Sequence, residues 1–211
     1  MSSDELKIAV LASGKGSNFL AILDAIKRGK IRNTQIVLVM SNNSGAGALA
    51  AARENRIPAV HISRTQFQSD EDFNRAFLKT LNEFGTNFIA LAGYMKMLDQ
   101  VVIKAFKNRI VNIHPALLPA FGGKGMYGMH VHEAVITGKS KISGATVHIV
   151  DEEYDRGPIV LQKSVDVAPD DTPESLAAKV LAIEHELYPE AIRLFAEGRI
   201  QINGQHVSIV N

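Results

Sequence analysis

Short apolar runs alternate with stretches of helical spacing through the first half of the chain, and this alternation constrains the fold more than any other feature. Residues 6–12 form the first such run, a glycine-containing turn occupies residues 13–18, and residues 19–27 have helical spacing. The pattern continues, with strands expected at residues 35–40, 59–62, 87–92 and 110–113 and helices at residues 45–54, 67–84 and 100–106. The sequence therefore predicts an α/β protein with a Rossmann-like, mostly parallel sheet that carries helices on both faces.

The pattern changes in the second half of the chain. Residues 143–150 and 159–167 are two β-type runs joined by an acidic turn, which predicts an antiparallel pair. We see no repeat or linker between the halves, so a single domain over residues 1–211 is expected, made of a half at 1–114 and a half at 115–211.

A long helix and a small hairpin are expected at the C-terminal end. Thr172 is a good N-cap and Pro173 suits the first helical position. Pro189 lacks a backbone N–H, which predicts a kink or a break in this helix. Asn203-Gly204 is typical of a two-residue hairpin turn.

Composition excludes several classes of protein. The 23 basic and 22 acidic residues give a net charge of +1, so no overall field would attract nucleic acid. The absence of cysteine excludes disulfides, a thiol nucleophile and cysteine-ligated zinc. Acidic residues near the start do not fit a signal peptide, and no apolar run reaches transmembrane length. We therefore expect a cytoplasmic protein that binds neither nucleic acid nor membrane.

Asn112 and His114 are candidate catalytic residues. They stand two apart at the end of an apolar run, so on a strand both side chains leave from the same face. Each type is also common as a hydrogen-bonded core residue, but an amide and an imidazole directed at one point suit a carbonyl oxygen that becomes negative. The pair favours acyl-transfer chemistry.

Asp155 is a candidate partner of His114. By itself it is explained as a turn residue, because Asp-x-Gly suits turns and the surrounding loop is acidic. If that loop folds over the strand end, the carboxylate can hold His114 protonated or relay a proton.

The first turn is a candidate phosphate site. Gly14 and Gly16 allow close backbone approach, and the amides of Gly16, Ser17 and Asn18 open a helix whose positive end attracts anions. The turn matches neither the dinucleotide nor the Walker pattern, and alone it is equally well explained as a plain strand-to-helix turn.

His130 and His132 form a His-x-His pair that on a strand could ligate a metal. No third ligand follows at a suitable spacing, which favours loop or substrate contacts instead. Glu184 is explained without a function by a solvated helix face or an ion pair within the helix. Met95 and Met97 are usually explained by adaptable core packing, although flexible apolar side chains also suit a flat ring.

The motifs taken together resemble phosphoribosylglycinamide formyltransferases, the folate-dependent enzymes of purine synthesis. The resemblance spans nearly the whole chain and implies the formyltransferase fold, with 10-formyltetrahydrofolate as co-substrate, small-molecule partners and no metal. It leaves monomer and homodimer open. It rests on residues 7–18, 91–95, 112–119, 144–148 and 155–158, in that order.

The resemblance also implies residue roles. Asn112, His114 and Asp155 would be catalytic. The ribonucleotide would be held by Gly16, Ser17, Asn18 and Glu184. Folate would contact Met95, Lys96, Met97, Leu98, Asn112, Val150, Asp151 and Asp155, with His132, Thr146 and His148 in support.

The chain departs from the family pattern at three places. Lys96 stands where arginine is frequent, an arginine expected near Asp70 is absent, and residues 122–129 form a longer, glycine-rich segment expected to act as a mobile flap. The absence of that arginine leaves open which residue anchors the folate tail.

Three other functions share parts of these motifs. A 10-formyltetrahydrofolate hydrolase has the same Asn-x-His and Asp pattern but normally an additional N-terminal domain. A methionyl-tRNA formyltransferase needs a longer, basic C-terminal part. A nucleotide-binding module without catalysis needs no Asn112, His114 and Asp155 set.

Overall fold

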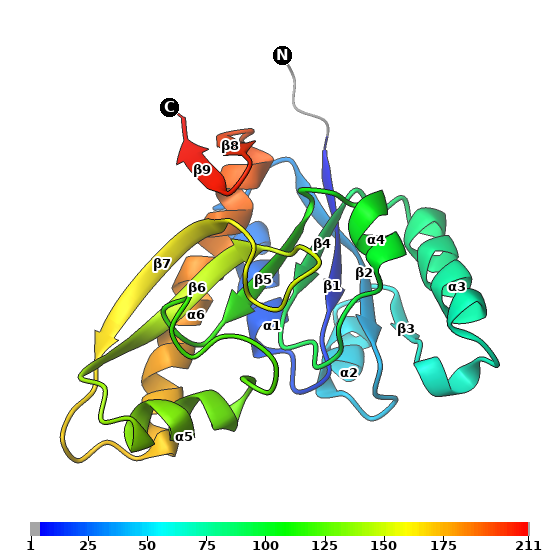
Figure 1. Cartoon of the computed structure of the whole chain (residues 1–211). Coiled ribbons are helices and arrows are strands. Elements are labelled where there is room, and N and C mark those ends of the chain that lie inside the picture. Colours follow the sequence, from blue (N-terminus) through cyan, green and yellow to red (C-terminus); the bar gives the residue numbers. More distant parts are fainter. Residues whose placement is uncertain (1–4, 211) are drawn as a thin grey trace.

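A seven-stranded sheet forms the centre of the protein (Figure 1), in a computed structural model that describes residues 5–210. The strand order is β3-β2-β1-β4-β5-β6-β7. The first five strands pair in parallel, whereas β6 pairs antiparallel with β5 and β7 antiparallel with β6. The predicted mostly parallel sheet with an antiparallel C-terminal pair is confirmed. The strands are β1 Leu6–Leu11, β2 Thr34–Ser41, β3 Ala59–His61, β4 Phe88–Leu91, β5 Ile110–His114, β6 Ile142–Ile149 and β7 Ile159–Asp166.

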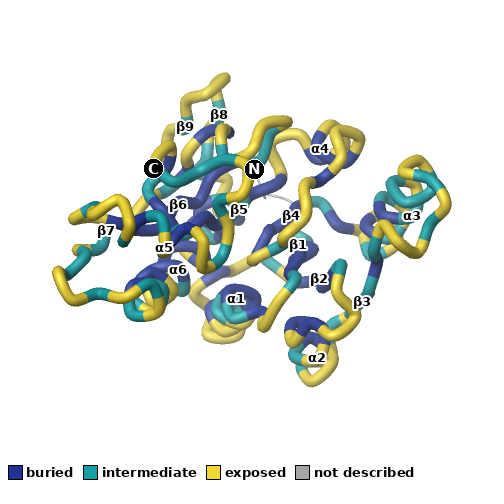
Figure 2. Tube along the Cα trace, turned by 60° about the horizontal axis from the view of Figure 1, so that its bottom comes forward, coloured by how far each residue is buried: buried dark blue, intermediate teal, exposed yellow. Residues whose placement is uncertain are grey.

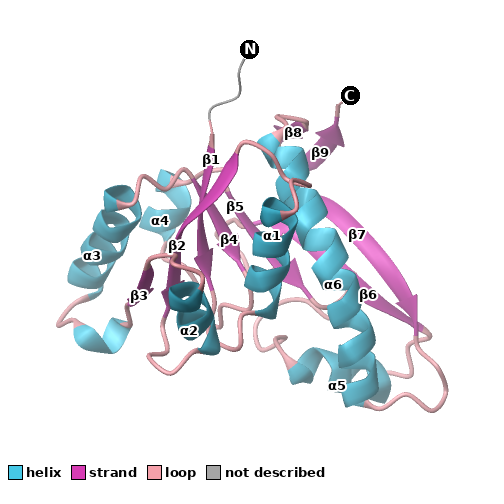
Figure 3. Ribbon diagram, turned by 180° about the vertical axis from the view of Figure 1, so that it is seen from behind, coloured by secondary structure: helices cyan, strands magenta, loops and turns pink. Residues whose placement is uncertain are grey.

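Helices cover both faces of the sheet, as predicted. Successive residues of β1 alternate between two cores: Ile8 and Val10 belong to one, Ala9 and Leu11 to the other. Figure 2 shows this buried centre, and Figure 3 shows α1, α2 and α6 side by side over the first core. Helices α3 and α4 cover the second core. The helices are α1 Ser17–Lys27, α2 Gly47–Glu54, the 3₁₀ turn η1 Arg64–Gln66, α3 Asp70–Glu83, α4 Gln100–Ala105, α5 Met129–Thr137 and α6 Pro173–Ala196.

Helix α6 begins where the sequence predicts. The Thr172 side chain accepts a hydrogen bond from the Ser175 amide, and Pro173 occupies the first turn. A break at Pro189 was expected as one alternative and is wrong, because the helix continues to Ala196. Buried residues on both sides of the proline, among them Tyr188 and Ala191, hold the helix against the sheet where one backbone hydrogen bond is lost.

Residues 129–137 form a helix that the sequence reading did not identify. His130 and His132 lie on α5 and not on a strand, so they point to different sides: His132 is buried and His130 is exposed. The alternative in which the pair supplies two metal ligands from one strand face, which the sequence disfavours, is therefore wrong. The predicted C-terminal hairpin is present as β8 Ile200–Asn203 and β9 His206–Ile209. Over residues 5–210, no helix has the length and apolar character needed to cross a membrane.

Candidate active site

Strand β5 carries Asn112 and His114 into a group of polar side chains. Asn112 lies opposite His148 on β6, and its Nδ2 atom is 3.1 Å from His148 Nε2. His114 Nδ1 is 3.6 Å from Asp155 Oδ2, and His148 Nε2 is 3.5 Å from Asp155 Oδ1. Asn112 and His114 therefore project from one face of β5, as their alternate positions predict. We call Asn112, His114, His148 and Asp155 the β5 cluster.

The loop between β6 and β7, yellow in Figure 1, brings Asp155 to this cluster. Asp155 has a φ of 54°, in the left-handed region, and its Oδ2 atom accepts a hydrogen bond of 2.9 Å from the Gly123 amide. The loop folds so tightly against β6 that a Cβ atom on Gly157 would lie 1.9 Å from the carbonyl oxygen of Ile149. Asp155 is thus held beside both histidines, a placement that the sequence left open.

Hydrogen bonds to backbone identify the ring nitrogen that carries the hydrogen in the neutral tautomer of each histidine. His114 Nε2 is 2.8 Å from the Phe121 carbonyl oxygen, and His148 Nδ1 is 2.9 Å from the Ile149 carbonyl oxygen. A carbonyl only accepts, so these two nitrogens carry the hydrogens. The opposite nitrogens face Asp155, which can accept a hydrogen bond from either ring once that ring gains a second proton.

Burial lowers the pKa of His114 below its usual value, because the ring is only 3% exposed. The charge of Asp155 and the Phe121 carbonyl raise the pKa but do not compensate, and His148 lowers it further. The expectation that Asp155 keeps His114 protonated is therefore wrong for this arrangement. Burial raises the pKa of Asp155, but a hydrogen bond from His148 once that ring is protonated, the positive charge that His114 or His148 then carries, and the hydrogen bond from the Gly123 amide together lower it.

The glycine turn after β1 forms the start of α1. Gly16 is the N-cap with a φ of 81°, and a Cβ atom there would lie 2.7 Å from the Cβ atom of Ala48. Gly16 therefore meets two requirements of glycine, a left-handed backbone and a close approach to α2. The amides that follow it open the helix, which gives the turn the geometry of an anion site.

Asn18 and Glu184 connect this turn to helix α6. The Asn18 Nδ2 atom donates to Glu184 Oε2 at 2.6 Å, and both residues are buried. Burial raises the pKa of Glu184, and the hydrogen bond from Asn18 lowers it less. Asn18 Oδ1 has no hydrogen-bond partner. The predicted ribonucleotide residues Gly16, Ser17, Asn18 and Glu184 are therefore brought together.

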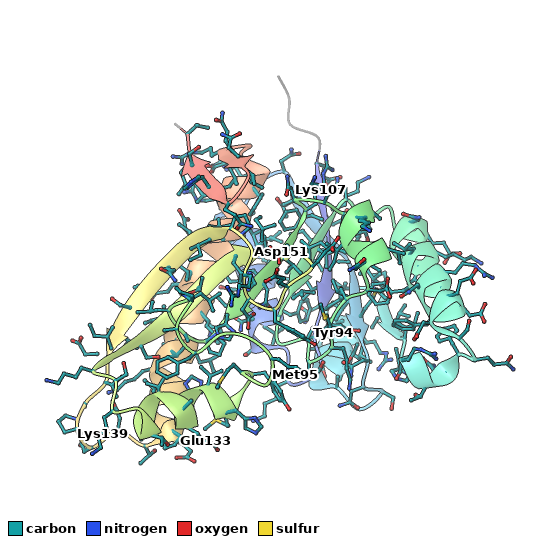
Figure 4. All side chains as sticks on the ribbon, in the orientation of Figure 1. Tyr94, Met95, Lys107, Glu133, Lys139 and Asp151 are labelled. Atoms are coloured by element: carbon teal, nitrogen blue, oxygen red, sulfur yellow. The ribbon has the colours of Figure 1, made fainter. Side chains whose placement is uncertain are left out.

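A cavity of about 640 Å³ lies between α3 and the loop that follows β4. Tyr94, Lys96, Met97 and Leu98 line one wall, and Arg64, which forms an ion pair with Asp70, lines the other. The expectation that no arginine stands near Asp70 is therefore wrong, because the fold brings Arg64 of η1 to the start of α3. Met95 does not line the cavity. In Figure 4, Tyr94 and Met95 lie below the loop that carries Asp151.

Ser13 ties this loop to the glycine turn. Its Oγ atom accepts a hydrogen bond of 2.8 Å from the Met95 amide and donates one of 2.5 Å to Asn42 Oδ1. The cavity loop and the glycine turn are therefore fixed relative to each other.

The sequence and the fold both match known proteins. Residues 6–192 match the model of the formyl transferase family. The chain belongs to this family. It is 42% identical over 97% of its length to the chloroplastic phosphoribosylglycinamide formyltransferase of Arabidopsis thaliana, of which it covers 70%. It is 34% identical over 94% of its length to the phosphoribosylglycinamide formyltransferase of Escherichia coli, of which it covers 91%. The crystal structure of glycinamide ribonucleotide transformylase 1 from Symbiobacterium toebii superimposes with a TM-score of 0.91 at 41% identity, covering 98% of this chain and 94% of that one.

His148, one of the three residues expected to support the site in this formyltransferase, is a member of the β5 cluster. A second, His132, interacts with it. His132 is buried on α5, its Nδ1 atom has no partner, and burial together with the charge of His114 lowers its pKa. Thr146 acts instead on the chain that follows β5, because its Oγ1 atom donates to the Ala116 carbonyl and accepts from the Leu118 amide.

Gln162 of the formyltransferase supports the chain after β5 and was not predicted from the sequence. Its Nε2 atom donates to the Leu118 carbonyl and to Thr146 Oγ1, both at 2.9 Å. The predicted pairing of β6 with β7 is what could have indicated this contact, because Gln162 lies opposite Thr146 in the register of the two strands. Over residues 5–210, no three His, Cys, Asp or Glu side chains are grouped so as to hold a metal ion.

Proposed function

We propose that the protein transfers the formyl group of 10-formyltetrahydrofolate to the primary amine of N1-(5-phosphoribosyl)glycinamide, giving formylglycinamide ribonucleotide and tetrahydrofolate. The observation that carries the proposal is the β5 cluster, in which Asn112, His114 and Asp155 meet at the end of β5. A phosphate-type turn and a cavity follow other strands of the same parallel sheet. Parallel strands bring their carboxyl ends to one edge of a sheet, where two substrates can meet.

The reaction forms one carbon–nitrogen bond and breaks another. The substrate amine attacks the formyl carbon, and the carbonyl oxygen becomes negative next to the Asn112 amide. The new negative charge raises the pKa of His114, so the ring takes up the proton that the attacking nitrogen releases. Asp155 then faces an imidazolium, which it stabilises. The proton passes to the folate nitrogen as the old bond breaks.

The ribonucleotide phosphate binds at the start of α1, at the amides of Gly16, Ser17 and Asn18. The positive end of the helix and the free N–H groups favour an anion there. Glu184 and the unpartnered Asn18 Oδ1 atom offer acceptors to the neutral, hydrogen-donating part of the same substrate.

Folate lies along the loop after β4, at Met95, Lys96, Met97 and Leu98, with its ring against Val150 and Asp151 and its formyl group toward Asn112 and Asp155. Val150 packs against the second core, which supports an apolar contact for a flat ring. Lys96 and Arg64 of the cavity wall are cations that suit the carboxylates of the folate tail. In this arrangement a single domain holds both substrates: residues 1–114 supply the phosphate turn and the loop after β4, and residues 115–211 supply Val150, Asp151 and Asp155 on the folate side.

One assay tests the proposal. The purified protein is given 10-formyltetrahydrofolate with the ribonucleotide, with water alone or with charged initiator tRNA, and release of tetrahydrofolate is followed. Release only with the ribonucleotide, together with formylated product, is expected. Equal release with water alone would instead identify a hydrolase, and dependence on tRNA would identify a tRNA formyltransferase. We also predict a cytoplasmic location, which cell fractionation tests. A monomer or a homodimer is expected, and sedimentation distinguishes the two.

A further inference from the structure

Tyr188 of helix α6 bonds to the sheet directly behind the β5 cluster. The residue has no exposed surface, and its hydroxyl oxygen is 2.9 Å from the Leu91 carbonyl oxygen and 3.1 Å from the Val111 carbonyl oxygen. Carbonyl oxygens only accept, so the hydroxyl donates and its one hydrogen is shared between two adjacent parallel strands. Burial and the nearby charge of Glu184 raise the pKa of Tyr188 well above its usual value, so the donor stays protonated.

The two carbonyls belong to the parts of the chain that carry the site. Leu91 is the last residue of β4, from which the cavity loop continues. Val111 precedes Asn112, so its carbonyl is part of the peptide group that orients the Asn112 backbone. Leu91 and Asn112 are also partners in the register of β4 with β5. The hydroxyl therefore fixes the separation and rotation of the two strands at the residue where the chemistry is proposed to occur.

Helix α6 joins a third part of the site through the preceding turn. Glu184 lies four residues before Tyr188, on the same side of the helix, and accepts the hydrogen bond of Asn18 from the glycine turn. One helix is thus bonded to the glycine turn, to β4 and to β5. A buried tyrosine commonly donates to some nearby carbonyl, so the hydrogen bond alone shows only packing. Its location on the peptide group of Asn112 distinguishes this one.

We infer that Tyr188 is a positioning residue for formyl transfer, acting through Asn112 without touching either substrate. The inference rests on the proposed function and adds a residue to it. A misplacement of about 1 Å at a reacting group lowers rates about 100-fold, so a partial shift of Asn112 lowers the rate about 10-fold.

The test is a double-mutant cycle of Tyr188→Phe with Asn112→Ala. Phenylalanine keeps the ring and removes only the hydrogen-bond donor. Alone, Tyr188→Phe is expected to lower kcat about 10-fold and to change KM for the ribonucleotide less than about twofold. In the Asn112→Ala background the same change is expected to lower kcat less than about twofold, because the group it positions is gone.

Thr80→Val is the control, because it removes a hydroxyl that donates to the Ala76 carbonyl within α3, at a residue that does not line the folate cavity. It should leave kcat unchanged. An equal loss of kcat from Tyr188→Phe in both backgrounds, or no loss in either, would overturn the inference while transfer by the parent protein still upheld the proposed function. If Tyr188→Phe does not fold, a fluorinated tyrosine at position 188 replaces it in the cycle, since it keeps the shape and changes only the donor strength.

Discussion

The negative charge of Asp155 lies 3.6 Å from His114 and 3.5 Å from His148, so this single carboxylate acts on both rings of the β5 cluster. Asp155→Asn keeps the shape of the side chain and can still accept the hydrogen bond from the Gly123 amide. It removes the charge that would stabilise the imidazolium formed during transfer. We expect kcat to fall about 100- to 10,000-fold while the circular dichroism spectrum is unchanged.

Glu153→Gln is the control for this change. Glu153 belongs to the same loop, but its side chain is 75% exposed and lies 3.9 Å from Arg156, so its charge is screened by water. Turnover of Glu153→Gln should match that of the parent protein. Near-parental turnover of Asp155→Asn would remove Asp155 from the proposed mechanism.

Single residues were predictable where the information is local. The two-residue spacing of Asn112 and His114 predicts a shared strand face, and the contacts of both side chains agree with it. The position of Asp155 depends on how a loop folds back against Ile149, which is a contact between distant parts of the chain. The direction of the pKa shift of His114 was predicted wrongly for the same reason, since its burial depends on tertiary packing around the Phe121 carbonyl.

At the scale of elements, the turn between β1 and α1 offers a matched pair of glycines. Gly16 has a φ of 81° and a Cβ atom there would meet Ala48 at 2.7 Å, whereas nothing lies within 4 Å of a Cβ atom on Gly14. Gly16→Ala is expected to lower the free energy of unfolding by about 1–3 kcal/mol and to raise KM for the ribonucleotide, because the start of α1 must move. Gly14→Ala should change neither quantity strongly. Urea unfolding measures the stability of both variants, and initial-rate kinetics measure their KM for the ribonucleotide. The same KM in Gly16→Ala and Gly14→Ala would exclude the turn as the phosphate site.

The loop after β4 gives a second prediction at this scale. Lys96 lines the cavity proposed to hold the folate tail, whereas Lys104 on α4 lies 4.0 Å from Glu152 and does not line the cavity. Lys96→Ala should raise KM for 10-formyltetrahydrofolate about fivefold, with little change in KM for the ribonucleotide. Lys104→Ala should leave both constants unchanged. A similar KM for folate in the two variants would show that the tail is anchored elsewhere.

Elements were predicted best where local chemistry sets their ends. Thr172 with Pro173 gave the start of α6, and Asn203-Gly204 gave the hairpin of β8 and β9. Helix α5, Met129–Thr137, was not predicted, because its N-cap residue is Gly128, which has no side chain to cap it, and a glycine-rich segment precedes it. The continuity of α6 through Pro189 was also beyond local rules, since packing against the sheet outweighs one lost hydrogen bond.

At the scale of the whole molecule, the sheet followed from the alternation of strands and helices. The alternate residues of β1 divide between two cores, which is what a run that is apolar on both faces requires. The strand order and the reversal at β6 bring the loop after β6 to the end of β5, so the topology itself assembles the β5 cluster. The spacing of these residues along the sequence does not reveal how close Asp155 lies to the two histidines.

The same burial that forms the site makes the whole molecule sensitive to acid. Burial lowers the pKa of both His114 and His132 below 6.5, so between these lowered values and 6.5 the unfolded chain binds more protons than the folded one. The stability contributed by each ring is complete above 6.5 and is lost as pH falls through its folded pKa. Asp155, whose pKa is lowered from 3.8, continues the loss at lower pH. Glu184 acts in the opposite direction, because its raised pKa adds stability below 4.5 that disappears as pH rises.

We therefore expect the free energy of unfolding, measured in urea, to fall between about pH 8 and about pH 5.5. His132→Asn should reduce that fall, because asparagine does not titrate and the buried ring with its lowered pKa is removed. His206→Asn, on the exposed surface of β9, is the control and should keep the parental pH dependence. A parental slope in His132→Asn would mean that His132 does not contribute to the acid sensitivity, and the loss would then have to come from His114 and from His185, whose pKa is also lowered by burial.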